Sequence, residues 1–214
     1  MGVLNVTPDS FSDGGRHLDH VAAVAHGRRL LAEGADLIDV GGESTRPGAE
    51  PVPEAEELRR VVPVIEALAA ETRVSVDTRK AAVAHAAIDA GATLVNDVSA
   101  SLHEVAAERG VGWVAMHMQG EPRTMQQRPR YDDVVAEVRD ALVATGWPVV
   151  VGTSRKGFLG AALAAADGVD EPVPTDDRLA GSVATATWAI AAGAGMVRVH
   201  DVTATVLASR LVAA

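Results

Sequence analysis

The chain of 214 residues contains no cysteine. This absence excludes a disulfide framework, a thiolate metal site and a cysteine nucleophile, and it is consistent with a reducing compartment. No apolar run approaches the ~20 residues that a membrane-spanning helix requires. The amino terminus has neither the charged region nor the long apolar region of a signal peptide. We therefore expect a cytoplasmic protein with no membrane partner.

Basic residues are in the minority, because 19 Lys and Arg residues are outnumbered by 29 Asp and Glu residues, for a net charge of -10. This balance argues against non-specific nucleic-acid binding and against a basic membrane-surface role. It is compatible with an anionic small ligand, since a few well-placed cations can dominate locally. The chain also has no G-x-G-x-x-G motif opening a helix, which weakens a dinucleotide-binding interpretation.

The composition, 48% hydrophobic and 22% charged, predicts one globular domain over residues 1–214 with a substantial core. Short, valine-rich strands are expected at 3–6, 37–40, 73–76, 93–95, 112–116, 148–151 and 196–199. Helices are expected at 21–33, 53–71, 81–90, 102–108, 131–144 and 179–192, and from about 203. Pro63 is expected to kink or split the second helix. The acidic, proline-bearing stretch 167–177 is expected to be a surface loop.

Alternating strands and helices predict βα units around a parallel sheet that is buried on both faces. Repeated units of this length favour an α/β fold of the (β/α)8 TIM-barrel type over an open doubly wound sheet. About seven strands are present, however, where a closed barrel of this class has eight.

Most of these strands end at a polar residue that a buried strand would not favour. The residues in question are Asn5, Asp77, Asn96, His117, Lys156, Arg198 and His200. In a barrel the carboxyl ends of the strands line one mouth, where active sites of this fold are built. These residues have ordinary alternatives: Asp77 or Thr78 could cap the next helix, and Asn96-Asp97 could do likewise. Lys156 could be solvated, and His117 could be a simple hydrogen-bonded histidine. Their recurrence at successive strand ends favours one shared site.

The residue types at these ends indicate the chemistry of a ligand. Arg198 and His200 are two residues apart and so point to one face of their strand, where a buried cationic pair is costly without an anion. Arg46 lies between glycines and, like Lys156, is suited to phosphate oxygens. Carboxylate and amide groups suit the edge of a nitrogen heterocycle. The sequence therefore predicts a pocket for a polar planar ring joined to a phosphate group.

Six motifs together resemble those of the dihydropteroate synthases, which are enzymes of folate biosynthesis. They are NVTPDSFSDGG at 5–15, DVGGESTRPG at 39–48, SVDT at 75–78, NDVS at 96–99, GTSRKGFLG at 152–160 and RVHD at 198–201. The first, second and fifth are long enough to be highly specific, and together the motifs are spread over almost the whole chain.

This resemblance implies a transferase that joins 6-hydroxymethyl-7,8-dihydropterin diphosphate to 4-aminobenzoate, releasing pyrophosphate, and that is a target of sulfonamides. It implies that Asn5 binds Mg²⁺ together with the diphosphate. The residues that would hold the leaving pyrophosphate are Thr45, Arg46, Arg198 and His200. Those that would bind the pterin ring are Asp77, Asn96 and Lys156. Those near the 4-aminobenzoate would be Phe11, Pro47 and Ser154. Asp77, Lys156 and Arg198 would carry most of the catalysis.

One departure from the family pattern concerns the region between the fifth and sixth strands. The family has a further strand there, ending in a motif like DPGIGFGK, but here the helix that begins near Tyr131 runs past Asp140 and Ala141 to Gly146. Either two helices are fused where a strand–helix unit is missing, or the protein contains a segment that this sequence omits. A seven-stranded remnant would reclose with altered tilt or expose strand edges.

Three functional alternatives follow. The first is an active dihydropteroate synthase, which by resemblance would be a homodimer. The second is an impaired or non-catalytic paralogue that still binds a pterin, which the missing unit favours. The third is a pterin-binding barrel that transfers a methyl group from a folate to a corrinoid protein. The retained cations and the first loop argue against the third.

Overall fold

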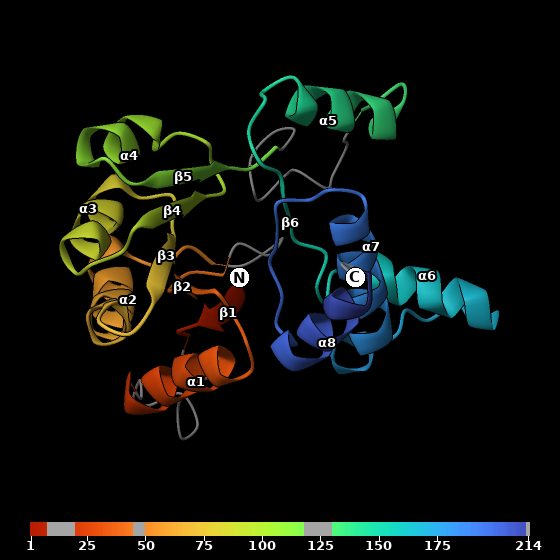
Figure 1. The fold of residues 1–214 in the computed structure, drawn as a ribbon, viewed down its shortest axis with the longest axis horizontal. Helices are drawn as coiled ribbons and strands as arrows, with labels where there is room; N and C mark the ends of the chain where they lie inside the picture. The colour runs from red at the N-terminus through yellow and green to blue at the C-terminus, as the bar shows by residue number, and fades with distance from the viewer. Residues whose placement is uncertain (8–19, 45–49, 118–129, 213–214) are drawn as a thin grey trace. The chain divides into compact units, whose positions relative to one another are not determined.

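The computed structural model describes residues 1–7, 20–44, 50–117 and 130–212 (Figure 1). The chain forms two compact units. The larger unit comprises Leu4–Arg29 and Asp36–Trp147, and the smaller comprises Met1–Val3, Leu30–Ala35 and Pro148–Ala214. Seven strands occur in the described residues, which agrees with the number that the sequence predicts.

A five-stranded sheet in the order β1-β2-β3-β4-β5 organises the larger unit. Its strands are β1 (Gly2–Asn5), β2 (Leu37–Gly41), β3 (Arg73–Asp77), β4 (Leu94–Asp97) and β5 (Gly112–Ala115). The helices that follow them are α1 (His20–Ala32), α2 (Glu54–Ala69), α3 (Ala81–Asp89), α4 (His103–Arg109) and α5 (Val134–Val143). The β2–β3, β3–β4 and β4–β5 pairs are parallel, as the alternating pattern predicts. Figure 1 shows α2, α3 and α4 on one side of these strands.

The core of this unit forms where the apolar runs of the strands meet the apolar stripe of α2. Ile38, Val40, Val74 and Val76 are fully buried in β2 and β3. On α2 the buried residues recur three and four apart, at Val61, Val64, Ile65 and Leu68, which is the spacing of one helix face. Strands with apolar residues at successive positions are typical of a parallel sheet that is covered on both faces.

The expected split of the second helix is wrong, because α2 continues through Pro63. Proline has no N–H to donate to the carbonyl four residues earlier, which is that of Arg59. The Nε2 atom of His20 lies 2.9 Å from this carbonyl oxygen and so replaces the missing donor. Pro63 itself is exposed, so its ring does not disturb the buried stripe.

The smaller unit contains a two-stranded parallel sheet of β6 (Val150–Val151) and β7 (Met196–Val197). Its helices are α6 (Gly157–Asp167), α7 (Leu179–Ala191), α8 (Val202–Val212) and the 3-10 helix η1 (Thr175–Asp177). Gly2 forms a parallel bridge with Val199, and the Val3 N–H donates to the Val199 carbonyl oxygen at 3.0 Å. Helix α6 is absent from the sequence expectations, whereas most residues of 167–177 are exposed, as a surface loop requires.

Strand β5 differs from its neighbours in exposure. It is the terminal strand of the five-stranded sheet, and its Gly112, Trp113 and Ala115 are exposed. Strands β1 to β4, in contrast, are largely buried. An exposed edge at β5 is one of the two outcomes expected if a strand is missing after β5.

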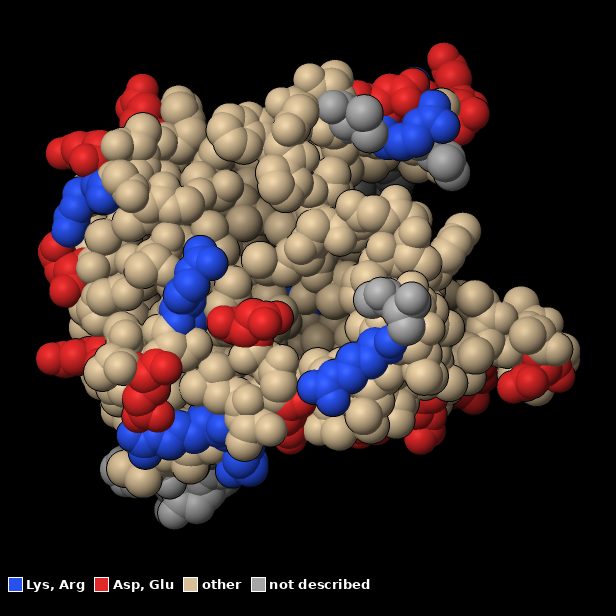
Figure 2. All heavy atoms as spheres, viewed as in Figure 1, with Lys and Arg blue, Asp and Glu red and all other residues tan. Residues whose placement is uncertain are grey.

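In the described part of the chain, no helix combines the length and apolar character needed to cross a membrane. On the face drawn in Figure 2, acidic and basic side chains are scattered among uncharged ones, and the described residues there form no extended basic patch.

Candidate active site

The carboxyl ends of the first four strands lie side by side in the larger unit. Gly41 is the register partner of Asp77, and Asp77 is the register partner of Asn96. The Val6 N–H donates to the Gly41 carbonyl oxygen at 2.7 Å, which brings the end of β1, and so Asn5, beside the end of β2. Asn5, Asp77 and Asn96 are all partly buried. The predicted clustering of strand-end side chains is therefore present for these three residues.

A buried carboxylate, which the sequence interpretation missed, lies next to this cluster. Asp39 on β2 is fully buried, and its Oδ2 atom accepts a hydrogen bond from the Nδ2 of Asn96 at 3.0 Å. This bond fixes the rotation of the Asn96 amide group, because its NH₂ end is directed at Asp39. The signal was a charged residue inside an otherwise apolar strand, between Ile38 and Val40.

Asp97, the residue after Asn96, has a structural role. It is fully buried and accepts hydrogen bonds from the Ser99 Oγ, the Leu102 N–H and the Trp113 Nε1, at 2.5, 2.7 and 3.2 Å. Burial alone would raise its pKa, but these donors outweigh burial and lower it. The helix-capping alternative for Asn96 and Asp97 is wrong, because the N-cap residue of α4 is Leu102 and α4 has no side-chain cap bond; Asp97 instead accepts from the N–H of that N-cap residue.

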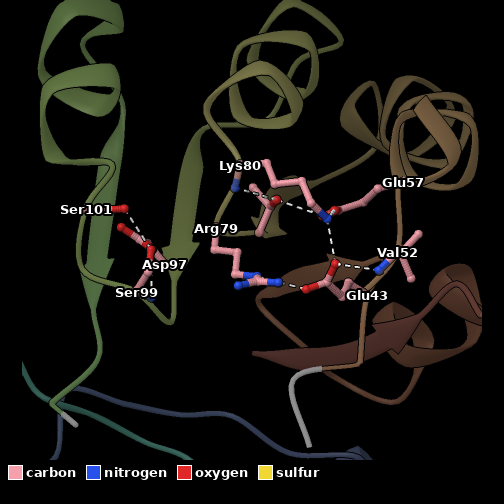
Figure 3. Close-up of polar contacts among 9 residues, drawn as sticks. Glu43, Val52, Glu57, Arg79, Lys80, Asp97, Ser99 and Ser101 are labelled. Carbon is pink, nitrogen blue, oxygen red and sulfur yellow. Dashed lines mark hydrogen bonds and ion pairs between the residues drawn. The ribbon is translucent and has the colours of Figure 1, made fainter. Parts of the chain in front are cut away.

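A cluster of charged residues joins the loops that follow β2 and β3 (Figure 3). It consists of Glu43, Glu57, Thr78, Arg79 and Lys80, and is called the Glu43 cluster below. The Nζ of Lys80 lies 2.5 Å from Glu43 Oε2 and also contacts Glu57 Oε2. Arg79 Nε donates to Glu43 Oε1 at 2.9 Å, and Thr78 Oγ1 donates to Glu57 Oε1 at 2.7 Å.

The charges of the Glu43 cluster stabilise one another. Burial would raise the pKa of Glu43, but hydrogen bonds from Lys80, the Val52 N–H and Arg79 outweigh it and lower that pKa. Burial would lower the pKa of Lys80, but its bonds to Glu43 and Glu57 raise it. Both groups are therefore charged at neutral pH.

The smaller unit places a second set of predicted residues together, after β6 and β7. The Oγ of Ser154 lies 3.0 Å from the Nδ1 of His200 and accepts from the His200 N–H at 3.2 Å. Arg155, which follows Ser154, has a φ of 59°. Its guanidinium donates twice to Asp201, which follows His200, at 3.2 and 2.7 Å. The Arg155 N–H donates to Ser182 Oγ at 3.0 Å. These bonds hold the turn after β6 against the end of β7.

Lys156 and Arg198 form the cationic part of this set. Burial lowers the pKa of Lys156, and the nearby positive charge of Arg198 lowers it further. The Arg198 N–H donates to the Val151 carbonyl oxygen at 2.9 Å, and a Cβ at Gly152 would lie 3.7 Å from the Cβ of Arg198, so Arg198 lies beside the start of the loop that follows β6. Two cations this close create a positive potential that would stabilise an anion such as a phosphate group.

Four predicted site residues, Phe11, Thr45, Arg46 and Pro47, lie outside the described residues. His117, just after β5, is exposed, and its Nε2 lies 3.4 Å from the Tyr131 hydroxyl. Among the residues that the structure describes, no group of three or more His, Asp or Glu side chains could hold a metal ion.

Comparisons with known proteins match this arrangement to one family. The family model described as pterin binding enzyme matches residues 1–145 and 139–200. The chain is 41% identical to the dihydropteroate synthase of Escherichia coli K12, over 100% of this chain and 90% of the relative. The chain belongs to the dihydropteroate synthase family of pterin-binding enzymes. It has the α/β fold of TIM-barrel type of that family, as the sequence predicts.

Solved dihydropteroate synthases support this assignment. The Yersinia pestis enzyme, in complex with a sulfonamide drug, aligns with a TM-score of 0.86 and 41% identity, covering 100% of this chain and 92% of the other. The Xanthomonas albilineans enzyme with 4-aminobenzoic acid aligns with a TM-score of 0.84 and 42% identity, covering 99% and 90%.

The comparisons also bear on the missing strand–helix unit. The alignment with the Escherichia coli dihydropteroate synthase spans 262 residues, whereas the chain has 214. The relative therefore contains residues that have no counterpart here. The two matches of the family model overlap at 139–145, a stretch that includes Asp140 and Ala141, where the sequence analysis locates the junction.

Proposed function

We propose that this chain catalyses the reaction that defines dihydropteroate synthases. It would join 6-hydroxymethyl-7,8-dihydropterin diphosphate to 4-aminobenzoate, giving 7,8-dihydropteroate and pyrophosphate. Similarity over the whole chain supports the proposal. The structural observation that carries it is the pairing of Asp77 and Asn96 at neighbouring strand ends, with Asp39 directing the Asn96 amide.

These residues would bind the pterin ring through complementary hydrogen bonds. The Asp77 carboxylate accepts hydrogen bonds from ring N–H groups. The NH₂ end of Asn96 already donates to Asp39, so its amide oxygen is the end that would accept from the ring. By resemblance to the family, Lys156 would be a further donor to the pterin.

The chemical step would require no protein nucleophile. The bond from the pterin methylene to the diphosphate oxygen breaks, and the electron pair leaves with pyrophosphate. The aniline nitrogen of 4-aminobenzoate then forms the new C–N bond and loses a proton. Arg198 and His200, together with Thr45 and Arg46, would stabilise the charge that builds up on the departing diphosphate. Asp77 would offset the positive charge that develops on the ring. Phe11, Pro47 and Ser154 would lie near the 4-aminobenzoate.

The residues present fit Mg²⁺ only if the diphosphate supplies most of its ligands. Asn5 offers one neutral amide oxygen at the end of β1, and the described residues contain no acidic or histidine cluster able to hold a metal alone. Mg²⁺ is commonly bound by few protein groups together with substrate phosphates and water. When bound, it would supply charge neutralisation to the diphosphate.

The decisive test is product formation by the purified chain with pterin diphosphate, 4-aminobenzoate and Mg²⁺. We expect pyrophosphate and dihydropteroate in equal amounts, and an Arg198→Ala variant should lose affinity for pterin diphosphate more than for 4-aminobenzoate. Exposed Arg210 on α8 offers a matched control, because Arg210→Ala removes the same charge from the same unit. If the folded chain binds pterin but shows no turnover, it is instead the non-catalytic paralogue. The residues that this chain lacks relative to the family favour that alternative.

We also propose a cytoplasmic homodimer that, like the Yersinia pestis relative, binds sulfonamides. Large apolar side chains on the helices of the smaller unit support self-association: Trp188 on α7 is 76% exposed, and Leu211 on α8 is 83% exposed. These two helices pack against each other, and large apolar side chains exposed on neighbouring helices are a feature of protein–protein contacts.

A further inference from the structure

The Glu43 cluster connects the loops that follow β2 and β3, and proposed site residues lie next to it in both segments (Figure 3). Glu43 follows β2 and precedes Thr45 and Arg46, whereas Lys80 follows β3 and Asp77. We propose that Glu43 and Lys80 are positioning residues, which together hold the two described ends of the β2–α2 loop, at Glu43 and Val52, against the residues that follow β3, and that binding of the diphosphate substrate depends on this arrangement. This inference rests on the proposed function, which it extends to residues that contact no reacting atom.

The first argument is that one carboxylate holds both ends of the β2–α2 loop. Glu43 lies at the start of the loop, and its Oε2 atom accepts a hydrogen bond from the N–H of Val52, at the end, at 3.0 Å. Arg60 on α2 donates to the carbonyl oxygen of Gly42 at 2.9 Å. A Cβ at Gly42 would lie 2.8 Å from Val61, so glycine permits this close approach to α2. The base of the loop is therefore tied at several points.

The second argument concerns the energetic cost of the arrangement. The side chains of Glu57, Glu43 and Lys80 are only 1%, 7% and 19% exposed. Burying charges is costly even when they are paired, and apolar replacements of similar volume are often as stable or more stable. Global stability alone therefore does not explain why the carboxylates of Glu43 and Glu57 are buried around the ammonium of Lys80. Fixed geometry between two loops is a better one, because charge-assisted hydrogen bonds are directional.

The third argument is that Glu57 anchors the pair to a rigid element. Glu57 lies on α2, the helix that packs against β2 and β3. It binds both Lys80 and Thr78, and Thr78 directly follows Asp77. Glu57 therefore attaches the residues that follow β3 to α2, and the bond from Arg60 to the Gly42 carbonyl oxygen attaches the end of β2 to the same helix. A shift of one loop relative to the other would break charged hydrogen bonds.

The test uses Glu43→Gln, which keeps the size of the side chain and removes its charge. We expect KM for pterin diphosphate to rise about tenfold, the factor that corresponds to about 1.4 kcal/mol, with kcat changed much less. Amide hydrogen exchange in residues 44–52 should accelerate. The matched control is Glu71→Gln, because the Glu71 carboxylate also accepts from an arginine, Arg28 at 2.6 Å, but in an exposed pair. This control should move neither quantity.

Lys80→Met alone leaves the buried Glu57 without its cation and is expected to fold poorly. The double variant Lys80→Met/Glu57→Gln removes that charge and should fold, yet it should show the same rise in KM as Glu43→Gln. A purely structural role predicts lower thermal stability with unchanged KM, and that result would overturn the inference. An inactive wild-type chain would instead refute the proposed function, and the exchange rates at 44–52 would then decide the anchoring role: unchanged rates in Glu43→Gln would exclude it.

Discussion

The Asp39–Asn96 pair permits a sharp test, because a substitution of one atom reverses its chemistry. Asn96→Asp keeps the shape of the side chain but replaces the NH₂ donor by a carboxylate oxygen. That oxygen would face the Oδ2 atom of Asp39, which is now 3.0 Å from the Asn96 nitrogen, at a site where Asp39 is fully buried. Two carboxylates at this distance cannot both be ionised and instead share one proton.

The cost of this substitution can be estimated from proton binding. A carboxyl pair of this kind holds its shared proton on the order of 2 to 3 pH units beyond the range of an isolated carboxyl. At 1.36 kcal/mol per unit, the folded variant should lose about 3 to 4 kcal/mol at neutral pH. Its folded state then binds more protons than its unfolded state, so its stability falls as pH rises and recovers as pH is lowered toward about 5.

Urea unfolding at pH 7 and pH 5 measures this difference. The matched control is the exchanged pair, Asp39→Asn with Asn96→Asp, which again contains one carboxylate and one amide. We expect the exchanged pair to recover most of the lost free energy and to lack the pH dependence of the single variant. A single variant whose free energy of unfolding equals that of the wild type at both pH values would refute the assignment of this hydrogen bond.

Two further predictions concern the smaller unit. Because burial and Arg198 lower the pKa of Lys156, affinity for pterin diphosphate should fall at a pH below that at which an ordinary lysine loses its proton. Lys156→Arg should abolish that fall and Arg198→Ala should move it to higher pH, as binding titrations can measure; an unchanged profile in both variants would contradict a cationic role for Lys156. Trp188→Gln should convert a dimer to a monomer in light scattering, whereas Trp147→Gln, which alters a tryptophan that is 79% exposed outside the smaller unit, should not. Equal masses for wild type and Trp188→Gln would exclude α7 as the contact.

The strand ends were predictable from the sequence because two local signals coincide there. An apolar run marks each buried strand, and a polar residue such as Asp77 or Asn96 marks its carboxyl end. In a parallel sheet with right-handed connections, these ends must lie along one edge, so residues far apart in sequence could be grouped without coordinates. The same reasoning placed Arg198 and His200 on one face of the chain, toward the loop of Ser154 and Lys156.

Features that depend on distant partners were not predictable. Helix α6 begins with glycine-rich sequence, and Gly160 suggests poor helix propensity. In the structure a Cβ at Gly160 would lie 2.6 Å from the Val173 carbonyl oxygen, so this glycine serves the packing of the following loop. Likewise, the donor that replaces the missing N–H of Pro63 in α2 comes from His20, on a different helix. Local propensity carries no information on either partner.

The junction of the missing unit shows why helices and strands respond differently to such a loss. Helix α5 begins after Asp133, which accepts from the Ala136 N–H at 3.0 Å, and Gly146 follows it with a φ of 69°. These are local signals, so the fused segment forms a helix whatever precedes or follows it. A strand depends on other strands, because its backbone hydrogen bonds are made with its neighbours in the sheet. In the described residues, β5 is the exposed last strand of the five-stranded sheet.

Two of the proposed pterin contacts, Asp77 and Asn96, lie on interior strands of the five-stranded sheet. Asp77 and Asn96 belong to strands that each have a partner on both sides, since β3 lies between β2 and β4, and β4 lies between β3 and β5. Their positions therefore depend on pairings that the shortened chain retains. The relatives contain residues that this chain lacks, but the Asp39–Asn96 bond and the Glu43 cluster are present here. For this reason pterin binding should survive in the chain even if turnover proves slower than that of its longer relatives.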